Sequence, residues 1–188
     1  MPKKVIAAGV VGWLVLALWI FVSNGIFGLR AGIDLKRIPD EARVYEVLKE
    51  SIVEPGGYMC YPPLTPDGRF PPGEPVFGIR YSGSGHEVAG RMMVIHHATS
   101  LVAAMIVSWM LSVTSLRILS SYLSKVFFCA SIGLLFAVFC DLPGYGIGAH
   151  TMRSALLLGG QSLVAWVLAG LAMAPCIRPD RKAVAADA

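Results

Sequence analysis

The chain has 188 residues, of which 55% are hydrophobic and only 15% are charged, and its formal net charge is +4. A soluble domain usually carries about 25% charged residues, so this composition disfavours a water-soluble globular protein. No nucleic-acid motif is present, and the basic residues flank apolar stretches, so they indicate a membrane and not a nucleic acid as the partner of the positive charge.

Four stretches of the sequence contain almost no charge, and each is long enough to cross a hydrocarbon core of roughly 30 Å as a helix. They cover approximately residues 5–27, 91–113, 122–141 and 152–175. The first stretch is longer than the ~7–15-residue apolar region of a signal peptide and lacks a small-residue cleavage site after it, so we expect a retained anchor. The predicted fold class is an all-α membrane protein, a bundle of four transmembrane helices with a small extracytoplasmic α+β loop domain.

The expected organisation is a first span in residues 1–27, the loop domain in 28–90, three spans in 91–176 and a cytoplasmic tail in 177–188. Within the loop domain, the segment Ile38-Pro39-Asp40-Glu41 is typical of a helix start, because acidic residues in a first turn favour the helix dipole. The residues that follow place apolar side chains at helical spacing and predict about three turns of amphipathic helix. These residues are Ala42, Val44, Val47, Leu48 and Ile52.

A small irregular hairpin is predicted after this helix. The segments 58–61 and 76–81 are short, aromatic and β-branched, and the turn-forming run from Pro62 to Gly68 lies between them. The loop domain is therefore expected to be folded, although its own core is too small to stabilise it without the membrane helices as a base. Cys60 lies alone in this loop, and the four cysteines of the chain show no CxxC spacing.

The distribution of basic residues predicts the orientation of the chain. Lysine and arginine are enriched on the cytoplasmic side of membrane proteins. If the N-terminus is cytoplasmic, the basic residues at both termini and between the second and third spans all lie on that side; they are Lys3, Lys4, Arg117, Lys125, Arg178, Arg181 and Lys182. We expect a multi-pass protein of the bacterial inner membrane, with both termini cytoplasmic and residues 28–90 periplasmic or extracellular.

Small residues recur at fourth-residue spacing in each predicted span. Helices in lipid pack closely through such residues, because the hydrophobic effect between them is weak. The stripes are Ala8 and Gly12; Ser100, Ala104, Ser108 and Ser112; Cys129, Gly133 and Ala137; and Ala155, Gly159, Ala165 and Ala169. The sequence therefore predicts a compact bundle with these residues at its helix contacts.

Ionisable residues gather at the outer end of the predicted bundle. His96 lies one step before the stripe of the second span, and Asp141 lies one step after the stripe of the third. His97 and His150 are expected in the same layer, together with Tyr145 and Arg153, and His86 and Glu87 just precede it. Because it costs free energy to place ionisable groups within a membrane, such residues are by default candidates for a functional site. His96, His97, Asp141 and His150 are the candidate cofactor-binding residues.

Three interpretations of this layer stay open. In the first, the groups hydrogen-bond each other and hold the loop onto the bundle. In the second they bind haem or a metal ion, since histidine is a good ligand for iron, copper and zinc, although two adjacent histidines point about 100° apart on a helix and do not easily share one ion. In the third, a His–Asp pair binds a quinone or a lipid near the interface. The sequence leaves the metal unknown and favours the absence of a cofactor.

Three short motifs resemble those of an uncharacterised family of small bacterial inner-membrane proteins. They are Pro39-Asp40-Glu41, Glu54-Pro55-Gly56-Gly57-Tyr58 and Asp141-Leu142-Pro143, and the last of them precedes Gly144-Tyr145-Gly146 where the family has aromatic residues. The resemblance implies a bacterial origin and a similar topology, and it brings no known activity.

The expected function is that of a non-catalytic accessory or assembly subunit of a larger membrane complex, for example an electron-transfer complex. The chain lacks a catalytic motif and a transporter repeat, and its folded outer loop suits docking. Membrane lipids and other membrane-protein subunits are the expected partners. Two alternatives remain, a redox subunit that binds haem b, a metal or quinone, and a small transporter that depends on Asp141.

Overall fold

The computed structural model describes residues 3–29, 38–83, 85–145 and 151–178. The chain is mostly helical, with one small two-stranded sheet. It divides into two compact units, one formed by Met1–Leu35 with Ile95–Ala188 and the other by Lys36–Val94. We call the first the helical unit and the second the loop unit. The loop unit includes the first turns of the second span.

The structure contains four helices that are long and apolar enough to cross a membrane. Each lies within a few residues of the stretch expected from the sequence, so the four predicted helices are confirmed. They are α1 (Lys3–Ile20) with the π-helical η1 (Phe21–Ile26); α4 (Gly85–Ser112); α6 (Tyr122–Phe136) with the π-helical η2 (Ala137–Asp141) and the 3₁₀ turn η3 (Leu142–Tyr145); and α7 (Met152–Met173). A short helix that the sequence did not predict, α5 (Leu116–Ser120), connects α4 to α6.

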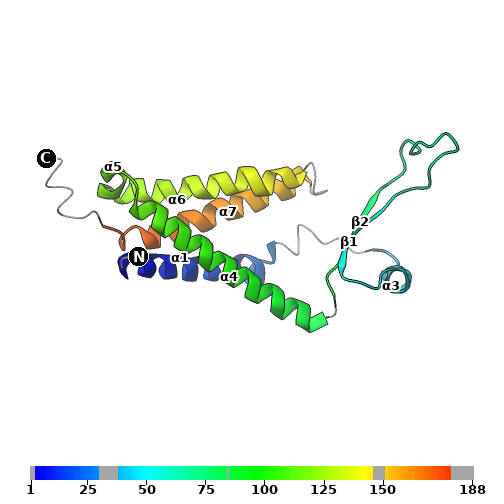
Figure 1. Ribbon diagram of the computed structural model, residues 1–188, viewed down its shortest axis with the longest axis horizontal. Coiled ribbons are helices and arrows are strands. Elements are labelled where there is room, and N and C mark those ends of the chain that lie inside the picture. The colour runs from blue at the N-terminus through cyan, green and yellow to red at the C-terminus, as the bar shows by residue number, and fades with distance from the viewer. Residues whose placement is uncertain (1–2, 30–37, 84, 146–150, 179–188) are drawn as a thin grey trace. The chain divides into compact units, whose positions relative to one another are not determined.

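Within the helical unit, α6 and α7 lie side by side and α1 packs against α7 (Figure 1). Glycines bring these helices together. A Cβ on Gly133 would lie 2.8 Å from Trp166 Cβ and 3.3 Å from the carbonyl oxygen of Ser162, and a Cβ on Gly170 would lie 2.7 Å from Cys129 Cβ. The backbones therefore approach too closely for any larger residue at either position. The small-residue stripes predicted this for Gly133, whereas Gly170 lies outside them.

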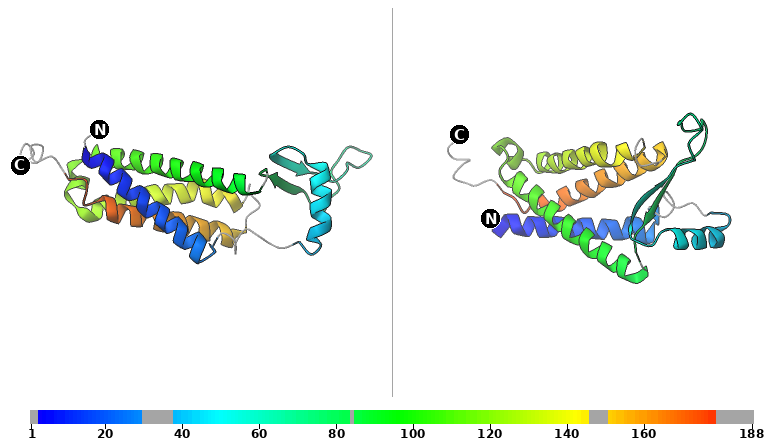
Figure 2. Two further views of the ribbon diagram at one scale, coloured as in Figure 1. Left: turned by 90° about the horizontal axis from the view of Figure 1, so that it is seen from below. Right: turned by 45° about the vertical axis from the view of Figure 1, so that its right-hand side comes forward.

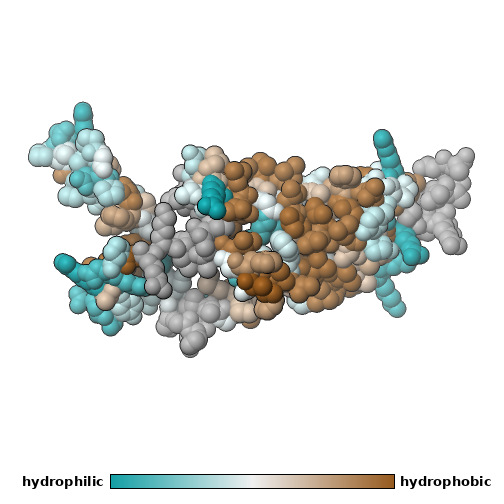
Figure 3. Space-filling view, turned by 180° about the vertical axis from the view of Figure 1, so that it is seen from behind, coloured by the Kyte–Doolittle hydropathy of each residue, from teal (hydrophilic) through white to brown (hydrophobic). Residues whose placement is uncertain are grey.

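The stripes are confirmed as packing faces. Eleven of their members are buried: Ala8, Gly12, Ala104, Ser108, Cys129, Gly133, Ala137, Ala155, Gly159, Ala165 and Ala169. The outermost members of the second stripe, Ser100 and Ser112, are only half-buried. The face of the helical unit in Figure 3 is dominated by hydrophobic side chains, which is typical of a bundle that meets lipid or other apolar helices.

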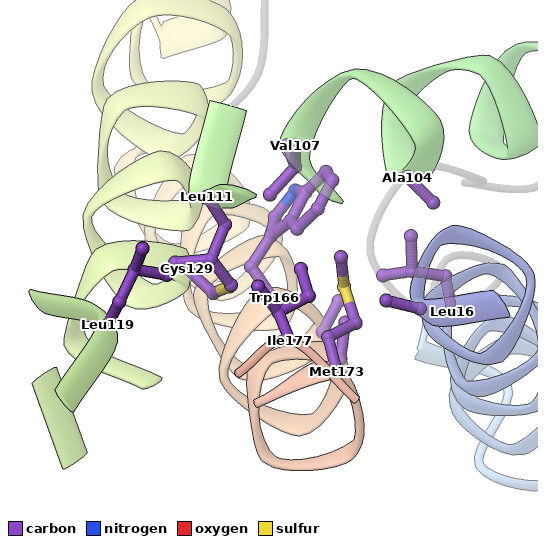
Figure 4. Close-up of a cluster of buried hydrophobic side chains, with 12 residues drawn as sticks. Leu16, Ala104, Val107, Leu111, Leu119, Cys129, Trp166, Met173 and Ile177 are labelled. Atoms are coloured by element: carbon purple, nitrogen blue, oxygen red, sulfur yellow. The ribbon is translucent and has the colours of Figure 1, made fainter. Parts of the chain in front are cut away.

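The hydrophobic core of the helical unit gathers around α7, with Trp166 and Met173 near its centre (Figure 4). Its apolar side chains come from every helix of the unit. They are Ala8, Leu16, Ala104, Val107, Leu111, Leu119, Cys129, Ala165, Trp166, Ala169, Met173 and Ile177. Ile177, which follows α7, is only 4% exposed and belongs to this core.

A hydrogen bond and a close approach join α4 to α1. The hydroxyl of Ser108, which is fully buried, donates to the carbonyl oxygen of Val5 at 2.6 Å. One turn further along α1, Gly9 lies against Met105, whose Cα would be 3.2 Å from an added Cβ. Small residues at both points let the two helices cross closely, which is the packing that membrane helices favour.

The end of α7 is stabilised by two side chains from the first turn of α6. Pro175 has no N–H to give the carbonyl of Leu171, four residues earlier, so this group would lack its helical partner. The hydroxyl of Tyr122 donates to that carbonyl at 3.0 Å. Lys125, only 6% exposed, donates through Nζ to the carbonyl of Ile177 at 2.9 Å, where the negative end of a helix favours a cation.

The loop unit contains one helix and one hairpin, as predicted (Figure 2). Helix α3 (Glu41–Ser51) begins after Asp40, and its half-buried Val44 and Leu48 lie on one face. Strands β1 (Gly56–Cys60) and β2 (Phe77–Tyr81) pair antiparallel, with Tyr58 opposite Ile79. Residues 61–76 connect them and include a turn in which the hydroxyl of Thr65 donates to the carbonyl of Arg69 at 2.8 Å.

Candidate functional site

Gln161 of α7 forms the centre of a polar contact with the end of the first span. Its side-chain nitrogen donates to Ser23 Oγ at 2.7 Å and lies 3.5 Å from Asn24 Oδ1. The indole nitrogen of Trp19 donates to the backbone carbonyl of Gln161 at 3.2 Å. Ser23 is fully buried, so this is an internal helix–helix contact, the role that single polar residues in spans most often have.

Ser162, the next residue of α7, forms a second polar contact with the end of the third span. Its hydroxyl donates to Asp141 Oδ2 at 2.6 Å. Gly159, one turn earlier on α7, allows this approach, since a Cβ there would lie 3.9 Å from Asp141 Cβ and 3.3 Å from Ala137 Cβ. A short bond to a carboxylate is about twice as strong as one between neutral groups, which makes it a good anchor between helices.

Adjacent residues of α7 thus bind two different helices, and we call Ser23, Asn24, Asp141, Gln161 and Ser162 the polar layer. Both partner segments are π-helical where they meet α7: η1 carries Ser23 and Asn24, and η2 ends at Asp141. A π-helical turn adds a residue to the helix and redirects its side chains, and such turns are frequent at functional sites. Here they aim the polar side chains inward at α7.

His97 lies in a different contact, between α4 and α1. Its ring meets that of Trp13 edge-on, with 6.4 Å between the ring centroids. His96, its exposed neighbour on α4, has its ring 6.0 Å from that of His97. The expected single layer is therefore divided: Asp141 binds α7, whereas the two histidines accompany the contact of α4 with α1. In the described part of the chain, His97 Nδ1 and Trp13 Nε1 are buried without a hydrogen-bond partner.

Among the described residues, Tyr145 and Arg153 do not join the polar contacts. Tyr145 is 53% exposed and Arg153 is exposed. His150 lies outside the described residues. Within residues 3–29, 38–83, 85–145 and 151–178, no group of three or more His, Cys, Asp or Glu side chains is placed to hold a metal ion.

A second candidate region lies on the hairpin of the loop unit. Cys60 pairs with Phe77 across the strands, and Tyr61, the next residue, has its ring 5.4 Å from that of Phe70. Val76 precedes Phe77 on the other strand. We call Tyr61, Phe70, Val76 and Phe77 the hairpin patch, and each of them is between 48% and 57% exposed. Exposed aromatic side chains of this kind are enriched at interaction surfaces relative to the rest of a protein's surface.

Two members of the polar layer, Ser23 and Ser162, were not predicted from the sequence. Asn24 and Gln161 are single polar residue types within apolar spans, and such residues more often form helix–helix hydrogen bonds than bind ligands, as they do here. The signal that could have identified Ser23 and Ser162 is the presence of two polar residues next to each other within a span. Each of these two spans contains a pair of neighbouring polar residues in an otherwise apolar stretch, Ser23-Asn24 and Gln161-Ser162, which offers polar groups to two directions of the helix at one depth.

Comparison of the chain with models of protein families, with curated proteins and with solved structures finds no match.

Proposed function

We propose that this chain is a multi-pass protein of the bacterial inner membrane that serves as a non-catalytic accessory or assembly subunit of a larger membrane complex. In this proposal both termini are cytoplasmic, α1, α4, α6 and α7 span the bilayer, and the loop unit docks onto a partner subunit outside the cytoplasm. The proposal rests on one feature of the loop unit: its helix and strands are formed, but its described residues bury no side chain.

The loop unit has regular secondary structure but lacks a core in its described part. Among residues 38–83, no residue is buried, although α3, β1 and β2 are all formed. An isolated two-stranded hairpin is at best marginally stable in water, and fixing one residue's backbone costs about 1–2 kcal/mol. The ordered loop unit therefore needs an external surface to cover its apolar side chains, and this single observation carries the proposal.

The exposed apolar side chains of the loop unit are of the kinds found at protein–protein interfaces. Phe77 is 57% exposed, and the hairpin patch offers three aromatic rings, the residue type that dominates binding at protein interfaces. Charges in the loop unit are mixed, with Arg69 near Asp67 at 3.7 Å and Lys49 near Glu46 at 3.8 Å. Such a surface has no single-sign patch to draw it to anionic lipid, which favours a protein partner.

The polar layer supports a scaffolding role for the spans. Gln161 and Ser162 use their side chains to hold α1 and α6 against α7, so these polar groups are satisfied by the chain's own residues. Interhelical hydrogen bonds of this kind contribute about 0.6–2 kcal/mol each within a membrane. Because these hydrogen bonds join the helices to each other, the loop unit is the part of the chain that we propose binds the partner.

One observation favours the alternative of a quinone-binding subunit. Within the described residues, His97 Nδ1 and Trp13 Nε1 are buried without partners, and both nitrogens can donate a hydrogen bond to a carbonyl oxygen. A purified chain that retains quinone or shows a haem Soret band, with the ligand lost in His97→Ala, would support this alternative over a purely accessory role.

The accessory role is tested by purifying the tagged full-length chain from native membranes in mild detergent. The chain should migrate in a complex with a defined partner, and Phe77→Glu should reduce the recovered partner at least fivefold, because it places a charge in the hairpin patch. Val53→Glu is the matched control: its side chain is equally apolar and more exposed, but it lies outside the patch. A chain that runs alone before and after chemical cross-linking would exclude the accessory role, whereas a complex that Phe77→Glu leaves intact would exclude docking through the hairpin patch.

A further inference from the structure

The hairpin of the loop unit has an open edge. Among the described residues its sheet contains two strands, so β1 and β2 each have one side that faces no other strand of this part of the chain. In the described part of the chain, the hydrogen bond that reaches β1 from outside the hairpin joins the Tyr58 hydroxyl to the carbonyl of Glu54 at 2.7 Å, and it involves no backbone group of β1. The backbone N–H and C=O groups on the outer side of β1 therefore remain available for pairing.

The two edges differ in how they are protected. Proteins usually block an exposed strand edge with lysine, arginine, proline or a bulge. Strand β2 carries Arg80, whereas β1 has the sequence Gly-Gly-Tyr-Met-Cys, which contains neither a charge nor proline. Its five residues pair with β2 in one continuous register, so β1 contains no bulge. Met59 and Cys60 are exposed, and the edge of β1 is thus regular, uncharged and accessible.

We propose that β1 pairs antiparallel with β1 of a second copy of this chain, which joins the two hairpins into one four-stranded sheet. Three or more strands are needed for a sheet that is stable in water, and two copies supply four. The charge pattern favours self-pairing through β1 over self-pairing through β2. A self-paired β1 brings no charged residues together, whereas a self-paired β2 centred on Ile79 would place Arg80 diagonally across from its own copy on one face of the sheet.

Symmetry fixes the register of this pairing. Alternate residues of a strand direct their backbone groups to the same edge, so a strand can pair with its own copy only about a two-fold axis that passes through a residue. Full overlap of β1 places that axis at Tyr58. Gly56 then lies opposite Cys60 of the second copy, and Gly57 lies opposite Met59 of the second copy. Cα atoms in such pairs are about 4.5–5.5 Å apart, a separation that a disulfide can bridge.

The glycines of β1 allow this register to be tested with one substitution. A Cβ on Gly57 would meet nothing within 4 Å, and a Cβ on Gly56 would make only an ordinary contact with the Tyr58 ring at 3.5 Å. Both positions therefore accept cysteine. In Gly56→Cys the new thiol faces Cys60 of the second copy, whereas in Gly57→Cys it projects from the other face of the sheet. Gly57→Cys is thus a matched control with the same number of thiols.

The experiment oxidises the full-length variants in native membranes with copper phenanthroline and separates the products on a non-reducing gel. Gly56→Cys should give at least ten times more disulfide-linked dimer than Gly57→Cys or the unsubstituted chain. As a second measurement, light scattering of the unsubstituted chain in mild detergent should give a protein mass that corresponds to two copies of this chain. This measurement does not depend on the folding of any variant.

Equal dimer yields in Gly56→Cys and Gly57→Cys would overturn the pairing through β1. A single copy in the purified protein, whether alone or bound to another subunit, would also overturn it. The inference does not rest on the accessory role, because the edge of β1 and the hairpin patch are different surfaces. Loss of the dimer with the partner still bound therefore contradicts only this inference, and loss of the partner with the dimer intact contradicts only the accessory role.

Discussion

At the scale of single residues, the chain satisfies polar groups that its own proline would otherwise leave without partners. Pro175 removes the N–H that the Leu171 carbonyl needs, and the Tyr122 hydroxyl replaces it. We expect Tyr122→Phe to lower the free energy of unfolding by about 0.5–1.5 kcal/mol, because the Leu171 carbonyl loses its hydrogen-bond donor. Thermal unfolding in detergent measures this change. Tyr145→Phe, at an exposed tyrosine, is the control and should unfold like the parent chain.

The bond between Ser162 and Asp141 gives a second prediction at this scale. Ser162→Ala should destabilise the bundle by about 1.5–3 kcal/mol, because it removes a hydrogen bond to a carboxylate. The double variant Ser162→Ala/Asp141→Ala should be less destabilised than the sum of the two single variants, since neither residue then leaves an unsatisfied partner. Full additivity in the double-mutant cycle would show that the two side chains do not interact in the native protein.

At the scale of helices, the approach of α6 to α7 depends on glycines that leave no space for a side chain. We expect Gly133→Ala to destabilise the bundle by about 1–3 kcal/mol, because its Cβ would meet Trp166 Cβ at 2.8 Å and the backbone of α7 at 3.2 Å. Gly160→Ala is the control on the facing helix, where nothing lies within 4 Å of an added Cβ. Unfolding of both variants in the same detergent provides the measurement.

This comparison separates packing from helix propensity. Alanine favours a helix over glycine by about 1 kcal/mol at either position, so propensity alone predicts that both variants gain stability. Only close packing predicts opposite signs. If Gly133→Ala is as stable as Gly160→Ala, α6 and α7 do not approach each other through these glycines.

At the scale of the whole molecule, the proposed topology places the loop unit outside the cytoplasm and both termini inside it. Cys60 is exposed on the loop unit and reports its side of the membrane. In intact cells whose outer membrane is permeable to the reagent, a membrane-impermeant maleimide should label the parent chain and not Cys60→Ser. In the Cys60→Ser background, Arg178→Cys should be labelled only after the inner membrane is opened. Labelling in the reverse order would contradict the topology.

The sequence by itself determined the features that depend on local chemistry. Apolar length predicted the four helices, fourth-residue spacing predicted the buried faces that contain Ala104 and Cys129, and the residues around Asp40 predicted the start of α3. These features follow from the chain's own periodicity, because the hydrophobic thickness of a bilayer and the geometry of a helix are the same for every sequence.

Only the tertiary structure decided which polar groups meet. Asp141 and the two histidines look equivalent in the sequence, yet Asp141 binds Ser162 on α7 and His97 lies against Trp13 on α1. Such pairings join residues far apart in the chain, and they depend on how each helix is rotated and which helix lies beside it. The π-helical turns that carry Ser23 and Asp141 change that rotation at the polar layer itself, so a regular helical period cannot reveal these partners.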